Sequence, residues 1–168
     1  LAQATIRPHE NKLVVEKGQL SLADNQWVIG AEVSNIAVEP QARIQASLAE
    51  GLVAGRAIGE TTINLEYANR LWTLTDSQAM WGKGRIQATG VFRPFDMEVR
   101  LTGTDLPFEE LLSAESKTPA KGRLNLAAVM DGSYKDWQLR GSWWIDDLRW
   151  NQQLISLPGL FKILKLTC

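Results

Sequence analysis

Few residues in this chain of 168 residues could carry out chemistry. His9 is the single histidine, so imidazole acid–base catalysis and a multi-histidine metal site have almost nothing to use. The single cysteine, Cys168, is the last residue, which removes a disulfide framework and a cluster of thiolate ligands. These counts argue against an enzyme and against a bound metal or other cofactor.

Two pairs of adjacent acids are the remaining candidates for general acid–base catalysis. Asp146 and Asp147 are neighbours, and neighbours along a strand point to opposite faces, so we interpret this pair as part of a bulge or turn. Glu109 and Glu110 follow Pro107, where acids in a first helical turn complement the helix dipole. Neither pair predicts a catalytic dyad.

Nucleotide and nucleic-acid binding lack support, and a sugar site has one candidate. The sequence Gly82-Lys83-Gly84 is too short to cradle phosphate and predicts a hairpin turn instead. The net charge is −1 and the basic residues are spread along the chain, so no nucleic-acid patch is expected. Trp143, Trp144 and Trp150 could stack on a sugar, but large aromatic side chains usually serve burial, so we expect core or groove packing.

Alternation of apolar and polar residues is the main structural pattern. The run 95–102 places Phe95, Met97, Val99 and Leu101 on one face and polar side chains on the other, as in a half-buried strand. The same alternation recurs in 44–48, 63–67, 85–89 and 123–126. Turn signals follow at 23–25, 68–70, 82–84 and 131–133. The pattern predicts an antiparallel meander and excludes a parallel α/β fold, because long helical crossovers are missing.

One short helix is predicted over 104–112, from a capping Thr104, an early Pro107 and apolar residues at helical spacing. The polar stretch 113–121 predicts a loop and a candidate boundary within a single β-rich segment covering 1–168. Three Lys-Gly pairs, beginning at Lys17, Lys83 and Lys121, precede alternating residues at irregular spacing. They favour hairpins stacked along one axis over a strict solenoid.

The tail 157–166 is the most apolar segment and contains two lysines three positions apart. It could be an interfacial or partner-binding helix, or it could pack on the sheet or continue a strand. Apolar stretches elsewhere are far shorter than the roughly 20 residues that cross a bilayer, so we expect any membrane anchor to lie outside this segment.

The stretch from about Thr61 to Trp150 resembles the AsmA-like superfamily of envelope proteins, most of all its TamB-like branch. The resemblance is carried by strands ending in Gly, as in 86–90, by 99–106 leading to a short helix, and by 122–126 and 131–141. It implies a long periplasmic protein, anchored in the inner membrane outside this segment, with an outer-membrane β-barrel as a partner. It also implies a sheet that forms an open, taco-like trough or partial barrel, whose apolar lining passes phospholipid acyl chains toward the outer membrane.

The inward positions of the clearest strands form the predicted lipid-binding groove, and a closed core remains an equal alternative for each. These positions are Ile63, Leu65, Tyr67, Trp72, Leu74, Ile86, Ala88, Phe95, Met97, Val99, Leu101, Leu124 and Leu126. The expected function is a non-catalytic segment that presents this groove in the cell envelope. Two alternatives stay open: a structural β-solenoid or protein-interaction spacer, and a carbohydrate-binding β-sandwich.

Overall fold

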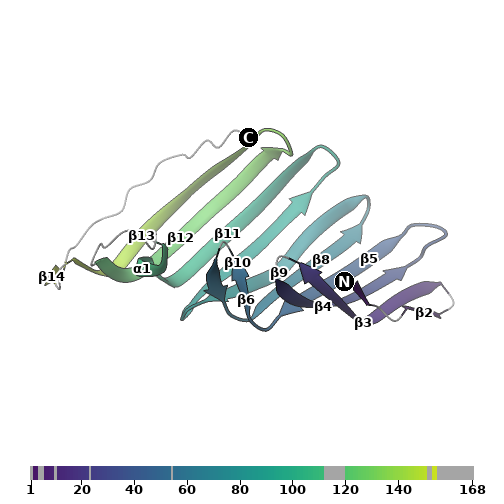
Figure 1. Ribbon diagram of the computed structural model, residues 1–168. Coiled ribbons are helices and arrows are strands. Elements are labelled where there is room, and N and C mark those ends of the chain that lie inside the picture. Colours follow the sequence, from purple (N-terminus) through teal and green to yellow (C-terminus); the bar gives the residue numbers. More distant parts are fainter. Residues whose placement is uncertain are drawn as a thin grey trace.

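The computed structural model describes residues 2–3, 6–9, 11–22, 24–53, 55–111, 120–150 and 153–154. Within them the chain is mostly β, and Figure 1 shows one large sheet with a single short helix beside it. The elements are β1 (Ala2–Gln3), β2 (Ile6–His9), β3 (Lys12–Leu22), β4 (Asn25–Ser34), β5 (Gln41–Leu48), β6 (Gly51–Val53), β7 (Arg56–Ile58), β8 (Thr61–Ala68), β9 (Leu71–Trp81), β10 (Gly84–Phe92), β11 (Asp96–Pro107), α1 (Phe108–Leu111), β12 (Ala120–Ser133), β13 (Trp137–Trp150) and β14 (Gln153–Leu154).

The large sheet has 12 strands and is an antiparallel meander, as predicted. From β3 to β13 each strand pairs with the next one in the chain, except that β5 pairs with β8. The exception arises because β6 and β7 leave the sheet as a separate two-stranded hairpin. β1 and β2 lie along the outer edge of β3, and β14 pairs with the end of β13, so the sheet is open.

The strand register joins the apolar positions of all these strands into one face, which we call the apolar face. Ala88 lies opposite Leu101, Leu101 opposite Ala128, and Ala128 opposite Gly141. Directly opposed residues share a face of the sheet, so one alternation continues from strand to strand. The opposite face, called the polar face, follows from the intervening positions, such as Thr89 opposite Arg100.

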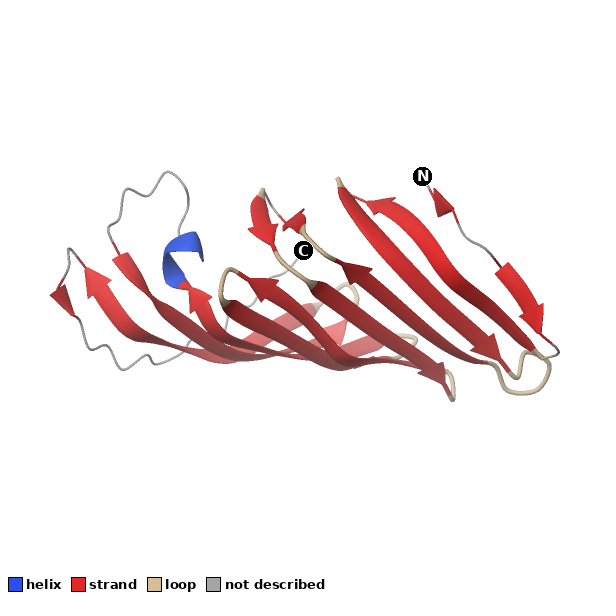
Figure 2. Ribbon diagram, turned by 90° about the horizontal axis from the view of Figure 1, so that it is seen from below, coloured by secondary structure: helices blue, strands red, loops and turns tan. Residues whose placement is uncertain are grey.

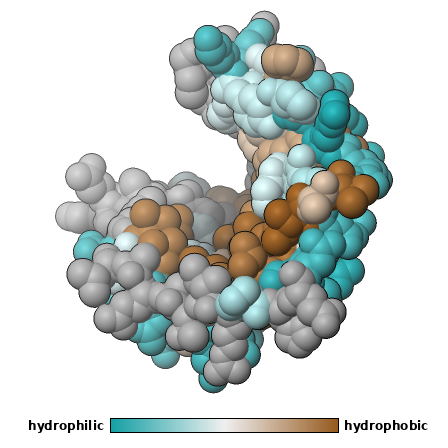
Figure 3. Space-filling model, turned by 90° about the vertical axis from the view of Figure 1, so that its right-hand side faces the viewer, coloured by the Kyte–Doolittle hydropathy of each residue, from teal (hydrophilic) through white to brown (hydrophobic). Residues whose placement is uncertain are grey.

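The apolar face is half-buried rather than covered by a second layer. Among the described residues, the buried apolar side chains are Leu48, Ile58, Val99, Leu106, Ala120 and Leu148. Most other apolar-face side chains keep part of their surface exposed. Figure 3 shows a hollow along whose inner wall apolar residues gather, while hydrophilic residues lie along its outer side.

Close strand contacts on the apolar face depend on glycine. A Cβ built on Gly90 would lie 2.6 Å from the carbonyl oxygen of Glu98, and one on Gly141 would lie 2.5 Å from that of Ala127. Neither distance is compatible with a side chain, so only glycine lets these strands approach so closely. The same holds for Gly84, in one of the three Lys-Gly pairs, because a Cβ there would lie 2.6 Å from the carbonyl oxygen of Asp105.

Three aspartates form bulges on alternate long strands of the sheet. Asp76 in β9, Asp105 in β11 and Asp147 in β13 have positive φ values of 41°, 53° and 53°. The pairing register shifts beside each of them. Asp tolerates the left-handed conformation better than most residues, and bulges increase the local twist of a sheet. The predicted bulge at Asp146 and Asp147 is thus confirmed.

Two predicted boundaries are wrong. The helix begins at Phe108, four residues later than Thr104, because 104–107 complete β11, where Leu106 pairs with Leu124 after the bulge. The predicted turn at 131–133 belongs to β12, and the chain turns at 133–136 instead. There the backbone amides of Ser133 and Asp136 each donate to the other's carbonyl oxygen, at 3.0 and 3.2 Å.

Candidate functional site

The structure brings twelve of the thirteen predicted groove residues onto the apolar face. On β8 and β9, Leu65 lies opposite Leu74 and Tyr67 opposite Trp72, whose rings are 5.1 Å apart between centroids. The remaining eight continue the same face across β8, β10, β11 and β12: Ile63, Ile86, Ala88, Met97, Val99, Leu101, Leu124 and Leu126. Residues from five strands, β8 to β12, thus contribute to one continuous apolar surface.

Phe95 is the exception, and its placement in a strand is wrong. It lies in the turn between β10 and β11 and is 84% exposed. The turn is closed by a hydrogen bond of 2.8 Å from the Arg93 backbone amide to the Asp96 carbonyl oxygen. Pro94 has no amide hydrogen to give to a ladder, so the alternation cannot continue back through this position.

The apolar face also extends beyond the predicted groove. On the N-terminal side it includes Val15, Trp27, Ile29, Ala31, Ile44 and Ala46, and on the C-terminal side Met130, Leu139, Trp143 and Ile145. Part of this set had a sequence signal, since the run 44–48 alternates. The run 27–29 does not alternate, because Val28 is apolar like its two neighbours. Val28 nevertheless lies on the polar face, where it is 46% exposed.

One end of the strands carries two elements that cover the apolar face, and we call it the covered end. The side chain of Asn25, 6% exposed, holds β6 through two hydrogen bonds with the backbone of Leu52, at 2.7 and 2.9 Å. Helix α1 meets the same end, where Glu110 accepts a hydrogen bond of 2.7 Å from the Trp81 indole. Figure 2 shows α1 and the β6–β7 hairpin rising on the same side of the sheet.

At the other end of the strands, which we call the open end, the described residues that connect the strands form turns. Its apolar-face residues include Tyr67, Trp72, Phe92, Met97 and Trp137, which are half-buried, and Leu13, which is 41% exposed. At the covered end, by contrast, Leu48, Leu106, Leu148 and Thr61 are each at most 7% exposed. Where α1 and the β6–β7 hairpin lie over it, the apolar face is therefore more deeply buried than at the open end.

The polar face is stabilised by exposed ion pairs between neighbouring strands. Lys12 contacts Glu32 at 2.8 Å, and this hydrogen bond lowers the pKa of Glu32. Arg123 bridges Asp105 at 3.1 Å and Asp147 at 2.7 Å, which raises its pKa, chiefly through Asp147. Exposed pairs of this kind contribute little stability each, so they mark a solvated surface rather than a site.

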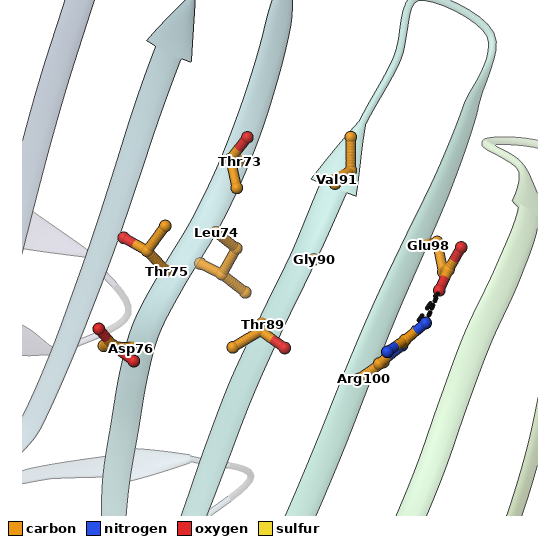
Figure 4. A pocket seen from close by; sticks show the side chains of 9 residues that line it. All are labelled: Thr73, Leu74, Thr75, Asp76, Thr89, Gly90, Val91, Glu98 and Arg100. Carbon is orange, nitrogen blue, oxygen red and sulfur yellow. Dashed lines mark hydrogen bonds and ion pairs between the residues drawn. The ribbon is translucent and has the colours of Figure 1, made fainter.

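A shallow hollow of about 520 Å³ lies on the polar face between β9, β10 and β11. Figure 4 shows its side chains, among them Thr73, Thr75 and Thr89, together with Arg100 hydrogen-bonded to Glu98. Threonines and one satisfied ion pair offer neither a nucleophile with an adjacent base nor a free cation. We therefore assign no chemistry to this hollow.

The other candidates for chemistry are not brought together. His9 ends β2 at one edge of the sheet, whereas Asp146 and Asp147 lie in the β13 bulge near the other. Trp143 lies on the apolar face and is 45% exposed, whereas Trp144 lies on the polar face and is 44% exposed. The prediction of core or groove packing is therefore wrong for Trp144. The tail 157–166 and Cys168 lie outside the described residues.

A metal centre and a membrane-spanning helix are both missing from the part of the chain that the structure describes. Nowhere in it do three His, Cys, Asp or Glu side chains gather closely enough to hold a metal ion. No helix there has the length and hydropathy of a membrane-crossing segment.

Comparison with known proteins gives no relative. No family model, no curated protein and no solved structure matches this chain.

Proposed function

We propose that this chain is a non-catalytic segment of a cell-envelope protein, and that its apolar face accommodates phospholipid acyl chains. The supporting observation is the continuous apolar face, which extends over nine neighbouring strands and has no second layer over its open end among the described residues. The proposed shape is the open trough of AsmA-like and TamB-like proteins, which the sequence between Thr61 and Trp150 resembles.

An apolar face of this extent is costly to leave in water and is stabilised by a ligand that covers it. Apolar surface left in water costs about 2.5 kcal/mol per 100 Å², at about 25 cal/mol per Å². The whole stability of a domain is only about 5–15 kcal/mol, so several hundred Å² of exposed apolar surface is a severe cost. An acyl chain would cover this surface without directional contacts and could therefore slide along it.

The residue types on the face fit hydrocarbon better than sugar. A sugar site combines an exposed aromatic ring with polar groups that fix the hydroxyls, whereas Leu65, Leu74 and Leu101 are surrounded by other apolar residues. A β-sandwich also needs a second sheet facing the first, and within the described residues the only other sheet is the two-stranded hairpin. The acyl-chain proposal is therefore preferred to the carbohydrate alternative.

The wider setting is part of the same proposal. The AsmA-like resemblance supports a location in the periplasm, an inner-membrane anchor elsewhere in the full protein and an outer-membrane β-barrel as a partner. A spacer or protein-interaction module would use the same sheet without any lipid.

Photo-crosslinking in cells tests the proposal with a matched pair of positions. A photoreactive amino acid replaces Leu101 on the apolar face or Thr102, its exposed neighbour on the polar face. We expect phospholipid adducts, detected by mass spectrometry, at position 101 and none at position 102. Leu65 and Glu66 form a second such pair on β8. Equal labelling of both faces, or none at 65 and 101, would leave the spacer function as the better explanation.

A further inference from the structure

The turns at the open end expose large apolar side chains where polar residues are usual. Val38 in the β4–β5 turn is 88% exposed, and Phe95 in the β10–β11 turn is 84% exposed. Ile36 and Tyr134 in the same set of turns are 46% and 50% exposed. We call the turns 35–40, 69–70, 93–95 and 134–136 the turn rim.

The turn rim forms one border of the sheet. Its four turns connect β4 to β5, β8 to β9, β10 to β11 and β12 to β13, and the register places all of them at the same ends of the strands. In Figure 1 they follow one another along the upper right border. The exposed apolar side chains of the turn rim therefore lie in a row along one border of the sheet.

Two of the turns are held to each other. The Tyr134 hydroxyl donates a hydrogen bond of 2.6 Å to the carbonyl oxygen of Arg93, which joins the β12–β13 turn to the β10–β11 turn. The Arg93 side chain pairs with Asp96 at 2.8 Å within its own turn. These two contacts hold the backbone of the turn that carries Phe95, while the Phe95 side chain itself is almost fully exposed.

The charges of the rim are balanced. Asp96, the residue next to the rim, pairs with Arg93, and the two remaining cations, Arg70 and Lys135, are matched in number by Glu39 and Asp136. A surface of mixed charge with apolar tips matches the interface of a zwitterionic bilayer, where aromatic side chains lie at the level of the head groups. A strongly anionic surface would call for an excess of cations, which the rim lacks.

We propose that the turn rim docks onto a zwitterionic lipid surface, with Val38 and Phe95 inserted among the head groups. The protrusions are single and are separated by whole hairpins. Such a row fits a fluid surface that deforms around each side chain better than a protein surface, which needs continuous shape complementarity. Docking would also bring the open end of the apolar face next to lipid, but it does not require that face to hold any.

Vesicle flotation tests the docking proposal with two double variants. Val38→Ser with Phe95→Ser removes the apolar tips of the rim, and Leu52→Ser with Val53→Ser removes two similarly apolar side chains, 51% and 49% exposed, from the β6–β7 hairpin. On phosphatidylcholine–phosphatidylethanolamine vesicles we expect the rim variant to bind about 100-fold more weakly, near tenfold per side chain. The hairpin variant should bind within a few-fold of the unmodified chain.

Three results would overturn the docking proposal: no flotation of the unmodified chain, equal losses in both variants, or binding that needs anionic lipid and disappears in salt. Unchanged thermal unfolding of both variants, expected from the exposure of the substituted residues, confirms that each is folded. A second experiment distinguishes docking by the turn rim from acyl-chain binding by the apolar face. Detergent-solubilised phospholipid is added to chains that carry a photoreactive amino acid at position 101. If the rim variant has lost only docking, it still crosslinks to this phospholipid.

Discussion

The two ends of the strands present the same kind of residue at different depths. At the covered end, Leu48 and Leu106 are each 2% exposed. At the open end, Trp72, Phe92 and Met97 occupy equivalent positions of neighbouring strands and remain half-buried. The difference comes from α1 and the β6–β7 hairpin, because the alternating pattern itself is the same at both ends.

In this one-layer sheet the buried apolar side chains lie at the covered end, where a local element lies over the sheet, with the exception of Val99, which is 5% exposed between Gly90 and Met130. Most other apolar-face side chains are contacted mainly by the two neighbouring strands and stay half-buried, because deep burial usually needs contacts from above as well. The covered end supplies these contacts through short segments inserted between strands. We infer that the covered end contributes most of the folding stability, and that the open end keeps the accessible apolar surface on which lipid binding depends.

The largest expected difference between the two ends concerns matched leucines of β11. Leu106→Ala leaves a cavity at the covered end and should lower the free energy of unfolding by about 2–5 kcal/mol. Leu101→Ala removes a half-buried side chain and should cost about 1 kcal/mol, because less surface returns to water. Urea denaturation of both variants measures the difference. Because Leu101 lies in the middle of β11, equal losses would mean that the apolar face beyond the covering elements is as well packed as the covered end.

The alternation that forms the apolar face was predictable, and so were the meander and a short helix. Period-two runs such as 63–67 and 85–89 assign each residue to a face without any knowledge of the partner strand. What they cannot assign is where a run ends. Phe95 fits the alternation of Met97 and Val99, yet Pro94 and the Arg93–Asp96 hydrogen bond place it in a turn.

The covered end was not predictable, because its features depend on tertiary contacts. Asp105 and Leu106 look like the start of a helix, but a bulge keeps them in β11, and its geometry is fixed by a hydrogen bond of 3.0 Å from the Asp105 amide to the Asn125 side chain. Asn25 likewise resembles an ordinary turn residue. Its role depends on Leu52, 27 positions away, and no local pattern contains that information.

Glycine substitutions on two different strands, β10 and β4, distinguish the apolar face from the polar face. Gly90→Ala would place a Cβ 2.6 Å from the Glu98 carbonyl oxygen and should cost about 1–3 kcal/mol, as overpacking usually does. Gly30→Ala on the polar face meets its first neighbour at 3.8 Å and should stabilise the strand by about 0.5–1 kcal/mol. Thermal unfolding should show the two variants moving in opposite directions. Similar shifts would remove the argument that glycine allows the close approach of strands on this face.

Removing the anchor of the β6–β7 hairpin should uncover part of the covered end. Asn25→Ala eliminates both hydrogen bonds to the Leu52 backbone and leaves two peptide groups without partners, which costs about 1–3 kcal/mol. Amide hydrogen exchange should accelerate at Leu52 and at residues of β7, while amides at the open end keep their rates. Unchanged exchange in the hairpin would show that other contacts hold it in place.

The contact between β9 and α1 gives the smallest expected effect and the most local one. Trp81→Phe removes the donor to Glu110, whose carboxylate is exposed and can bind water instead, so the loss should be about 0.5–1.5 kcal/mol. Exchange of the α1 amides should rise, whereas the β6–β7 hairpin should keep its protection. Glu110→Gln retains an acceptor oxygen and should lose less than Trp81→Phe. If instead the two variants release the hairpin together with α1, the two covering elements form one cooperative unit, and the covered end then opens as a whole.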